Sequence, residues 1–313
     1  MTMPVDANTS SHRTDWSGDS SDASGPPPPS DERSDRTVAH DRYNAYIAGG
    51  TCNYACGPAD AVDRPALFRK QNGDAHEIDV HDVKQNQLDD CFLMATLAAL
   101  ARTPEGRSVI KNAIAENKNA AGEVVSYTVT LHKPQERYGA LGGRALALVS
   151  ITVDGQFVCG HAKARTDGSG SEVWPLVIER AFQEYKGRTY GMCNGDEKRG
   201  GPPKIAMELL TGNEAKQTAL WSLAGYRSYS ADRLQTDVDS GKIVVLDTKE
   251  NFEGANPYGL INFHAYVVTG TENRDGRLYV NLHNPYDSDV QQVPYSDLEE
   301  WFAAVDVGSV RAN

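Results

Sequence analysis

The segment from Gln85 to Arg102 (QNQLDDCFLMATLAALAR) constrains the fold of this chain more than any other. From Cys91 onward it is apolar, rich in Ala and Leu, and free of Gly and Pro. Such a stretch predicts a buried helix. Asp89 and Asp90 stand where a helix N-cap belongs. The segment therefore places Cys91 at or beside the N-terminus of a buried helix.

The stretch that follows this helix alternates between strand and helix patterns. Residues 123–131 and 145–158 read as strands, and the pair Asp154–Gly155 is a strong signal for a tight hairpin turn. Residues 173–187 carry the apolar stripe of an amphipathic helix, for which Gly187 is the expected C-cap. A Gly- and Pro-rich break comes next, and then a short helix at about 205–210.

The C-terminal part of the chain is dominated by strand patterns. Residues 296–302 read as a short helix that opens on a Ser cap. A turn at Asp275–Gly276 is expected to join the second and third of four strands, which we predict at 242–247, 263–269, 277–283 and 290–293. The order is a helix-led half followed by a sheet-led half.

Residues 1–40 differ from everything that follows. They are rich in Ser, Asp, Pro and Gly and include a run of four prolines from Pro26 to Pro29. Such a segment buries too little apolar surface to offset the entropy of ordering it. We therefore expect a disordered tail. A plain linker, a secretion address and a cleavable pro-segment all fit this composition.

Composition excludes some functions and narrows the compartment. The formal net charge of −12 argues against nucleic-acid binding, which usually needs a basic face. No apolar run is long enough for a membrane span, and the N-terminus lacks the pattern of a Sec signal peptide. Five cysteines spread over a long chain do not form a disulfide framework. We expect a cytoplasmic protein, or one exported without a Sec signal, in which case a Cys52–Cys56 bridge is an option.

Cys91 is the first candidate for a chemical role. A lone cysteine is usually a small buried hydrophobe. A helix N-terminus, however, places partial positive charge beside the sulfur and favours the thiolate. Thiol catalysis also needs a histidine, a group that orients the imidazole, and donors for an oxyanion.

His264 and Asn284 can supply the histidine and the orienting group. His264 opens one predicted strand and shares a face with Tyr266 and Val268, whereas Asn284 ends the strand of the next hairpin arm. The hairpin would hold the two side chains within reach of each other. His283 points to the opposite face and is the poorer base. A histidine on a strand is more often only a hydrogen-bonded core residue.

Gln85 and a group of cysteines with His161 are further candidates for chemical roles. Gln85 lies six residues before Cys91 in a turn-prone stretch, and its amide could donate to an oxyanion beside the sulfur, or it could be a surface glutamine. A zinc site is the weaker alternative, because the spacing of its candidate ligands is loose: Cys52, Cys56, Cys159 and His161.

Several of these motifs resemble the calpain family of cysteine peptidases. The block Gln85-Asn-Gln-Leu-Asp-Asp-Cys91-Phe-Leu-Met-Ala-Thr is similar to the family's Gln-Gly-x-Leu-Gly-Asp-Cys-Trp-Leu-Leu-Ala-Ala. His264-Ala-Tyr-Val-Val resembles His-Ala-Tyr-Ser-Val, and Asn284-Pro-Tyr resembles Asn-Pro-Trp. Supporting matches lie at Ile151-Thr-Val-Asp-Gly, at Val173-Trp-Pro-Leu-Val-Ile-Glu-Arg-Ala-Phe and at Gly212. The resemblance covers about residues 65 to 305, in the family's order and near its spacing.

The resemblance implies a papain-like, two-lobed α+β fold. Residues 41–215 would form the lobe that bears Cys91, and residues 216–313 a β-rich lobe that bears His264 and Asn284. Cys91 would act as nucleophile, His264 as base and Asn284 as its orienting group. Gln85, together with the Cys91 backbone N–H, would hold the oxyanion.

Some positions depart from the family pattern. Asn86 and Asp89 replace two glycines, and both residue types tolerate left-handed backbone better than most. Phe92 and Tyr286 replace two tryptophans and remain aromatic. These changes bear on rate and specificity more than on mechanism.

The resemblance also raises the question of calcium. Animal calpain cores bind this ion, and Asp82 and Glu179 match carboxylates of their first site, although acidic residues on solvated faces commonly bind nothing. No cofactor is required for the chemistry itself. The expected substrates are proteins or peptides. We therefore predict a cysteine endopeptidase acting through a Cys91 thioester. An acyltransferase or deamidase on the same triad and a catalytically silent binding module are the alternatives.

Overall fold

The computed structural model describes residues 62–135, 145–155, 157, 160–186, 200–224, 226–252, 256–286 and 290–310. The tail predicted over residues 1–40 and the C-cap predicted at Gly187 lie outside these residues. Helices and antiparallel strands both occur up to Thr211, and antiparallel strands dominate the C-terminal part, so the fold is α+β as the sequence predicts.

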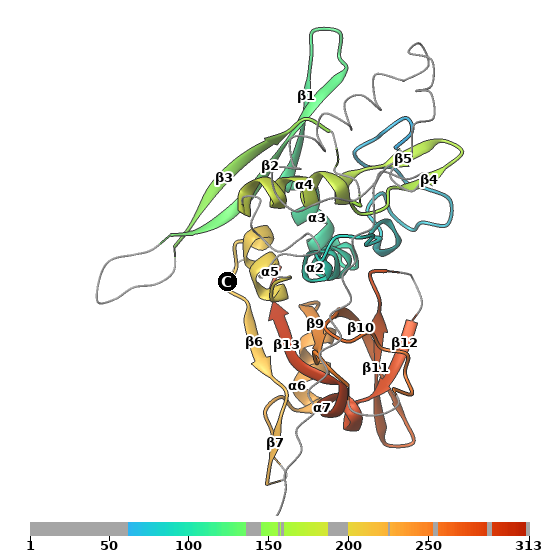
Figure 1. Cartoon of the computed structure of the whole chain (residues 1–313), viewed down its shortest axis with the longest axis vertical. Coiled ribbons are helices and arrows are strands. Elements are labelled where there is room, and N and C mark those ends of the chain that lie inside the picture. Colours follow the sequence, from blue (N-terminus) through green and yellow to red (C-terminus); the bar gives the residue numbers. More distant parts are fainter. Residues whose placement is uncertain are drawn as a thin grey trace, which may run out of the picture.

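Helix α2 (Cys91–Ala101) is the centre of the molecule. All of its residues from Phe92 to Ala101 are buried, which confirms the predicted buried helix. In Figure 1 it lies between two sheets, beside α5 (Pro203–Thr211) and near α3 (Pro104–Ala113). Because Gly106 of α3 lies against the backbone of Leu100, a Cβ there would be 2.1 Å from that carbonyl oxygen. The glycine therefore permits the close crossing of α3 over α2.

A three-stranded antiparallel sheet lies on one side of α2 (Figure 1). Its strands are β1 (Ile114–Lys118), β2 (Val124–Gln135) and β3 (Ala145–Val153), in that spatial order. Helix α4 (Trp174–Lys186) crosses this sheet. The short strands β4 (Arg165–Asp167) and β5 (Gly170–Glu172) form a separate ribbon, and the single helical turn η2 (Val80–Asp82) precedes α2.

A six-stranded antiparallel sheet lies on the other side of α2. Its spatial order is β12-β11-β10-β9-β13-β6. Helices α6 (Ala231–Asp239) and α7 (Leu298–Trp301) pack on its outer face. The strands are β6 (Lys216–Ala219), β9 (Ile243–Thr248), β10 (Ala265–Arg274), β11 (Arg277–His283), β12 (Val290–Pro294) and β13 (Phe302–Gly308). The remaining elements are the hairpin of β7 (Ser222–Leu223) with β8 (Tyr226–Arg227) and the turn η3 (Tyr295–Asp297).

Alternation along the strands gives this sheet two buried faces. Ala265 and Val267 face α2 and join the larger hydrophobic core. Tyr266 and Val268 face α6 and α7 and join a second, smaller core. The sheet is therefore buried on both sides where β9 and β10 run, which explains the continuous apolar run IVVL of β9.

The predicted turn at Asp275–Gly276 is confirmed, whereas most of the residues that would follow the turn predicted at Asp154–Gly155 lie outside the described residues. β10 and β11 pair through Asp275 and Gly276, whose φ values of +52° and +76° are those of a tight hairpin turn. β3 ends at Val153, its described ladder is formed with β2, and Gly155 has a φ of +73°.

No helix in the described ranges has both the length and the apolar character that a bilayer crossing requires.

Candidate active site

Cys91 is the first residue of α2 and faces a cavity. Asp90 is the N-cap residue, and its carbonyl accepts hydrogen bonds from the N–H groups of Leu93 and Met94. The Asp90 side chain makes no capping hydrogen bond. Cys91 is partly exposed to a cavity of about 500 Å³ that His264 also lines. Its sulfur hydrogen-bonds the backbone of Ala265, the residue after His264.

His264 is fixed through its backbone at the start of β10. Its N–H donates to Thr248 Oγ1 at 2.8 Å, and its carbonyl accepts from the Thr248 N–H at 2.9 Å. Phe263 precedes it with φ +51°, a left-handed conformation that turns the chain sharply into the strand. The sequence predicted a strand from residue 263, and β10 begins at Ala265 because this turn occupies the first two positions.

The imidazole of His264 is oriented by Asn284. Its Nε2 lies 2.9 Å from Asn284 Oδ1, which also accepts from the Tyr286 N–H at 3.0 Å. An amide oxygen can only accept, so Nε2 carries the hydrogen and Nδ1 keeps a lone pair. Tyr286 stacks on the ring at 4.9 Å with an interplanar angle of 11°. The structure therefore brings these two predicted residues together and covers their contact with an aromatic ring.

His283 occupies the other face, as strand alternation predicts. It lies opposite Val267, whose side chain faces α2. Val280 and Leu282 belong instead to the core that contains Tyr266. His283 is buried and does not line the cavity with Cys91.

Gln85 is buried beside the site but does not line the cavity. Its Nε2 donates to the Leu88 carbonyl at 2.8 Å, and its backbone N–H donates to the Pro285 carbonyl at 2.8 Å. One amide hydrogen of Gln85 is thus used within its own loop and one is left for another acceptor. The second bond joins the segment before Cys91 to the segment of Asn284.

The electrostatics of the site favour neutral forms of both Cys91 and His264. Burial, together with the charges of Asp247 and Asp90, raises the pKa of the Cys91 thiol to about 12. Burial lowers the pKa of His264 to about 4, against the opposing effect of the Asn284 hydrogen bond. The sequence predicted that the helix N-terminus would favour the thiolate. Burial and the two nearby carboxyl groups act against that effect, since they raise the pKa of the thiol.

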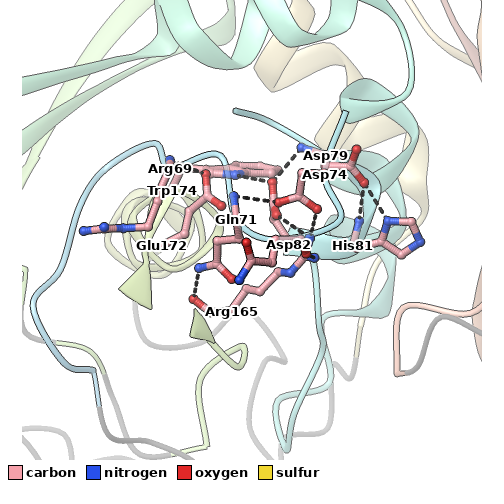
Figure 2. A network of polar contacts seen from close by, with 10 residues as sticks. Arg69, Gln71, Asp74, Asp79, His81, Asp82, Arg165, Glu172 and Trp174 are labelled. Carbon is pink, nitrogen blue, oxygen red and sulfur yellow. Dashed lines mark hydrogen bonds and ion pairs between the residues drawn. The ribbon is translucent and has the colours of Figure 1, made fainter. Parts of the chain in front are cut away.

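Asp82, which precedes Cys91 by nine residues, belongs to a buried acidic cluster (Figure 2). Carboxylate oxygens of Asp74, Asp82 and Glu172 lie within 4.8 Å of one another, and all three residues are buried. Arg165 forms ion pairs with Asp74 and, at 3.3 Å, with Asp82. Trp174 Nε1 donates to Asp82 at 3.2 Å. Burial, with the charges of its neighbours, raises the pKa of Glu172.

Glu179 is not a member of this cluster, which corrects its predicted pairing with Asp82. Both of its carboxylate oxygens accept from the Ala162 N–H, at 2.9 and 3.1 Å. Its carboxyl also hydrogen-bonds Asp90, whose pKa burial raises. Glu172, seven residues earlier, takes the place beside Asp82. Glu172 ends the strand β5 and Glu179 lies within α4, so sequence spacing alone could not choose between them.

The acidic cluster fits a hard divalent cation. Calcium prefers carboxylate and carbonyl oxygens, and three carboxyl groups converge here. Glu172 Oε2 is buried and receives no hydrogen bond from an N–H group within the described residues, although the carboxyl group bonds that of Asp82. An orphaned buried oxygen of this kind is what a bound cation would satisfy.

Three of the four candidate zinc ligands, Cys52, Cys56 and Cys159, lie outside the described residues. His161 is buried, and its Nδ1 lies 2.5 Å from the Ala162 carbonyl.

Sequence reasoning missed three residues of the cavity. Thr248 holds the His264 backbone, Asp247 lines the cavity beside it, and Phe263 presents an exposed ring. The signal for the first two was their position at the end of an apolar strand, where polar side chains commonly reach a site.

A cysteine at a helix N-terminus that shares a cavity with an Asn-oriented histidine defines the thiol-peptidase class of site. The chain belongs to the calpain family: residues 58–308 match the family described as calpain family cysteine protease.

Similar curated proteins carry the same family name. The chain is 25% identical over 248 residues to "Calpain-type cysteine protease DEK1" of Arabidopsis thaliana, which covers 76% of this chain and 10% of that protein. It is 24% identical over 261 residues to "Calpain-B" of Drosophila melanogaster, covering 78% and 25% respectively. "Calpain-A" of the same fly is 25% identical over 231 residues, covering 70% and 26%. The chain thus spans between 10% and 26% of the length of these relatives.

Proposed function

We propose that this protein is a calpain-like cysteine endopeptidase with a papain-like, two-lobed arrangement, which cleaves protein substrates. The observation that carries the proposal is the His264–Asn284 hydrogen bond beside a cavity that Cys91 and His264 both line. Two hydrophobic cores, one around α2 and one on the outer face of the six-stranded sheet, support the two lobes.

The neutral resting forms lead to a general-base mechanism. The Cys91 sulfur attacks the scissile carbonyl carbon while its proton passes to His264 Nδ1, so that no free thiolate has to persist in the cavity. The oxyanion formed is stabilised by the Cys91 backbone N–H and the remaining amide hydrogen of Gln85. His264 then returns the proton to the leaving amine, and the C–N bond breaks to give a thioester. Water, activated by the same nitrogen, hydrolyses the thioester and regenerates the thiol.

Calcium is the cation that we propose for the acidic cluster. Asp74, Asp82 and Glu172 would hold it, and its charge would offset the repulsion among their buried carboxylates. It supplies no chemistry at Cys91. It would instead tie the segment that precedes α2 to the segment that opens α4.

The test compares wild type with Cys91→Ala on casein, with products identified by mass spectrometry and a thiol-reactive inhibitor as a second control. We expect peptide products from wild type and a loss of at least about a thousandfold in the variant, since the nucleophile is gone. Circular dichroism should give the same spectrum for both forms, because only a small side chain is removed.

The same digest separates the alternatives. Deamidated or acyl-transferred side chains without new termini would indicate the transferase or deamidase. No modification of any kind, with Cys91 unreactive toward the inhibitor, would indicate a silent binding module and refute the peptidase.

A further inference from the structure

A pair of carboxyl groups lies at the wall of the cavity beside Cys91 and His264. Asp247, on β9, lines the cavity, and Asp306, on the neighbouring strand β13, lies next to it. The two carboxyl groups hydrogen-bond each other. None of the catalytic steps above uses either residue.

The two carboxyl groups have different surroundings. Asp306 is fully buried, and its two oxygens accept from the Lys204 backbone N–H at 2.9 Å and from Gln217 Nε2 at 3.0 Å. Asp247 is only partly buried, and Gln217 approaches it at 3.4 Å. Asp306 is thus a fixed inner partner, and Asp247 is the member that a bound molecule can reach.

Within the described residues, no cation forms an ion pair with either carboxyl group. Lys204 acts on Asp306 through its charge but does not come within ion-pair distance. The described lining of the cavity contains no Lys or Arg and adds a second carboxylate, Glu250. Burial and the charge of Asp306 raise the pKa of Asp247. A pair that shares one proton carries one negative charge, which matches one bound cation.

The rest of the lining suits a long side chain with a charged end. Pro202, Ala265 and Ala304 provide apolar walls for a methylene stem. The Phe263 ring is 59% exposed and is held in a left-handed backbone conformation that a side chain adopts only at a cost. An exposed aromatic face beside a carboxylate is favourable for a guanidinium or ammonium group.

We propose that this cavity is a specificity pocket for a substrate residue with a cationic side chain, arginine or lysine, next to the scissile bond. Asp247 is the counter-ion and Asp306 holds it in place. The inference rests on the proposed function, since the pocket opens beside the proposed nucleophile. It adds to that function a preference that the catalytic triad does not itself create.

The test uses pairs of peptide libraries that are identical except for arginine or its neutral isostere citrulline at one fixed position. We expect the wild-type kcat/KM for arginine to exceed that for citrulline at least about tenfold at one position near the cleaved bond. In Asp247→Asn the ratio should fall to about one, because the amide keeps the shape and loses the charge. Glu300→Gln, which removes one exposed negative charge outside the pocket, should keep the wild-type ratio.

Two further variants guard against misfolding and locate the charge. Asp247→Ser replaces Asp247→Asn if the latter does not fold. Asp306→Asn should retain the arginine preference, because the remaining Asp247 can ionise alone and still faces the cavity. A preference lost in Asp306→Asn but kept in Asp247→Asn would overturn the assignment.

Binding to Cys91→Ala separates this inference from the proposed function. The same libraries are passed over immobilised Cys91→Ala and over immobilised Cys91→Ala/Asp247→Asn. The peptides that each protein retains are quantified by mass spectrometry. Arginine enrichment that requires Asp247 supports the pocket even if wild type cleaves nothing, in which case the peptidase proposal fails alone. Cleavage of both libraries at equal rates, with equal retention, overturns the pocket and leaves the peptidase standing.

Discussion

Cys91 and His264 have pKa values displaced toward their neutral forms, by burial in both cases. The effect is larger than the attraction of a helix N-terminus for a thiolate, which amounts to roughly one pKa unit or less at most sites. Asp90 and Asp247 add negative charge on the side of the sulfur. Both displacements favour a neutral thiol and a neutral imidazole over an ion pair.

The pH dependence of Cys91 alkylation tests this directly. With a thiol pKa raised to about 12, the reactive thiolate is a minor species at neutral pH, and it grows as pH rises. The rate of reaction with iodoacetamide should increase about tenfold per pH unit from about pH 6 to about pH 9.

Peptide mapping isolates Cys91 from the other four cysteines, and Cys91→Ala identifies its peptide. A rate that is already on a plateau at neutral pH would mean a preformed thiolate–imidazolium pair and would contradict the neutral assignment.

The β10–β11 hairpin is the element that selects which histidine reaches the site. Its tight turn at Asp275–Gly276 sets the pairing, and an irregularity between Val268 and Gly270 shifts the register by one residue. Beyond that shift Val267 lies opposite His283, so His283 faces α2. Asn284, one residue later, is left facing His264.

Replacing each histidine tests this register. His264→Ala should lower kcat at least about a thousandfold, since the base is lost. His283→Gln should keep turnover within about tenfold of wild type while lowering the melting temperature, because it changes a buried side chain outside the cavity. Kinetics on a casein-derived peptide and thermal melts measure the two effects. A larger loss of turnover in His283→Gln than in His264→Ala would refute the register.

At the scale of the whole molecule, the acidic cluster joins distant parts of the chain. Asp74 and Asp82 precede α2, whereas Arg165 lies on β4 and Glu172 on β5, directly before α4. Among the described residues, three buried carboxyl groups with Arg165 as their cationic partner leave an excess of acid in this cluster. A bound calcium ion would favour the folded state by mass action.

Calcium should therefore raise the melting temperature. At a concentration 100-fold above its Kd, the ion would add about 2.7 kcal/mol to the free energy of unfolding. For a domain of this size that corresponds to an increase of roughly 5–10 °C in the melting temperature. Differential scanning calorimetry in EGTA and in added calcium measures it.

Two matched variants decide which glutamate takes part. Glu172→Gln should abolish the calcium-induced shift, whereas Glu179→Gln should keep it, because Glu179 bonds Ala162 and Asp90 instead. If calcium does not raise the melting temperature of wild type, the cluster does not bind the ion. Arg165 is then its cationic partner among the described residues. That result would not affect the peptidase proposal.

The local pattern of the sequence was enough to predict the elements that carry the site. The apolar run after Asp90 gave the buried helix, and alternation with an Asp–Gly turn predicted the hairpin that joins His264 to Asn284. It was insufficient for α3, α6, β1, β6 and β13, whose segments are short or weakly periodic. These elements form because neighbouring strands and helices offer them an apolar face, which no local window contains.

Which residues form a local element was thus determined by the sequence alone, because periodicity and turn chemistry act between near neighbours. The surroundings of charged groups were decided only by tertiary structure. Asp82 lies beside Glu172 rather than Glu179, the pKa of the Cys91 thiol is raised, and Asp247 contacts Asp306, a residue 59 positions later in the chain. Each of these outcomes depends on desolvation and on charges brought close by folding, and neither quantity exists until the chain has packed.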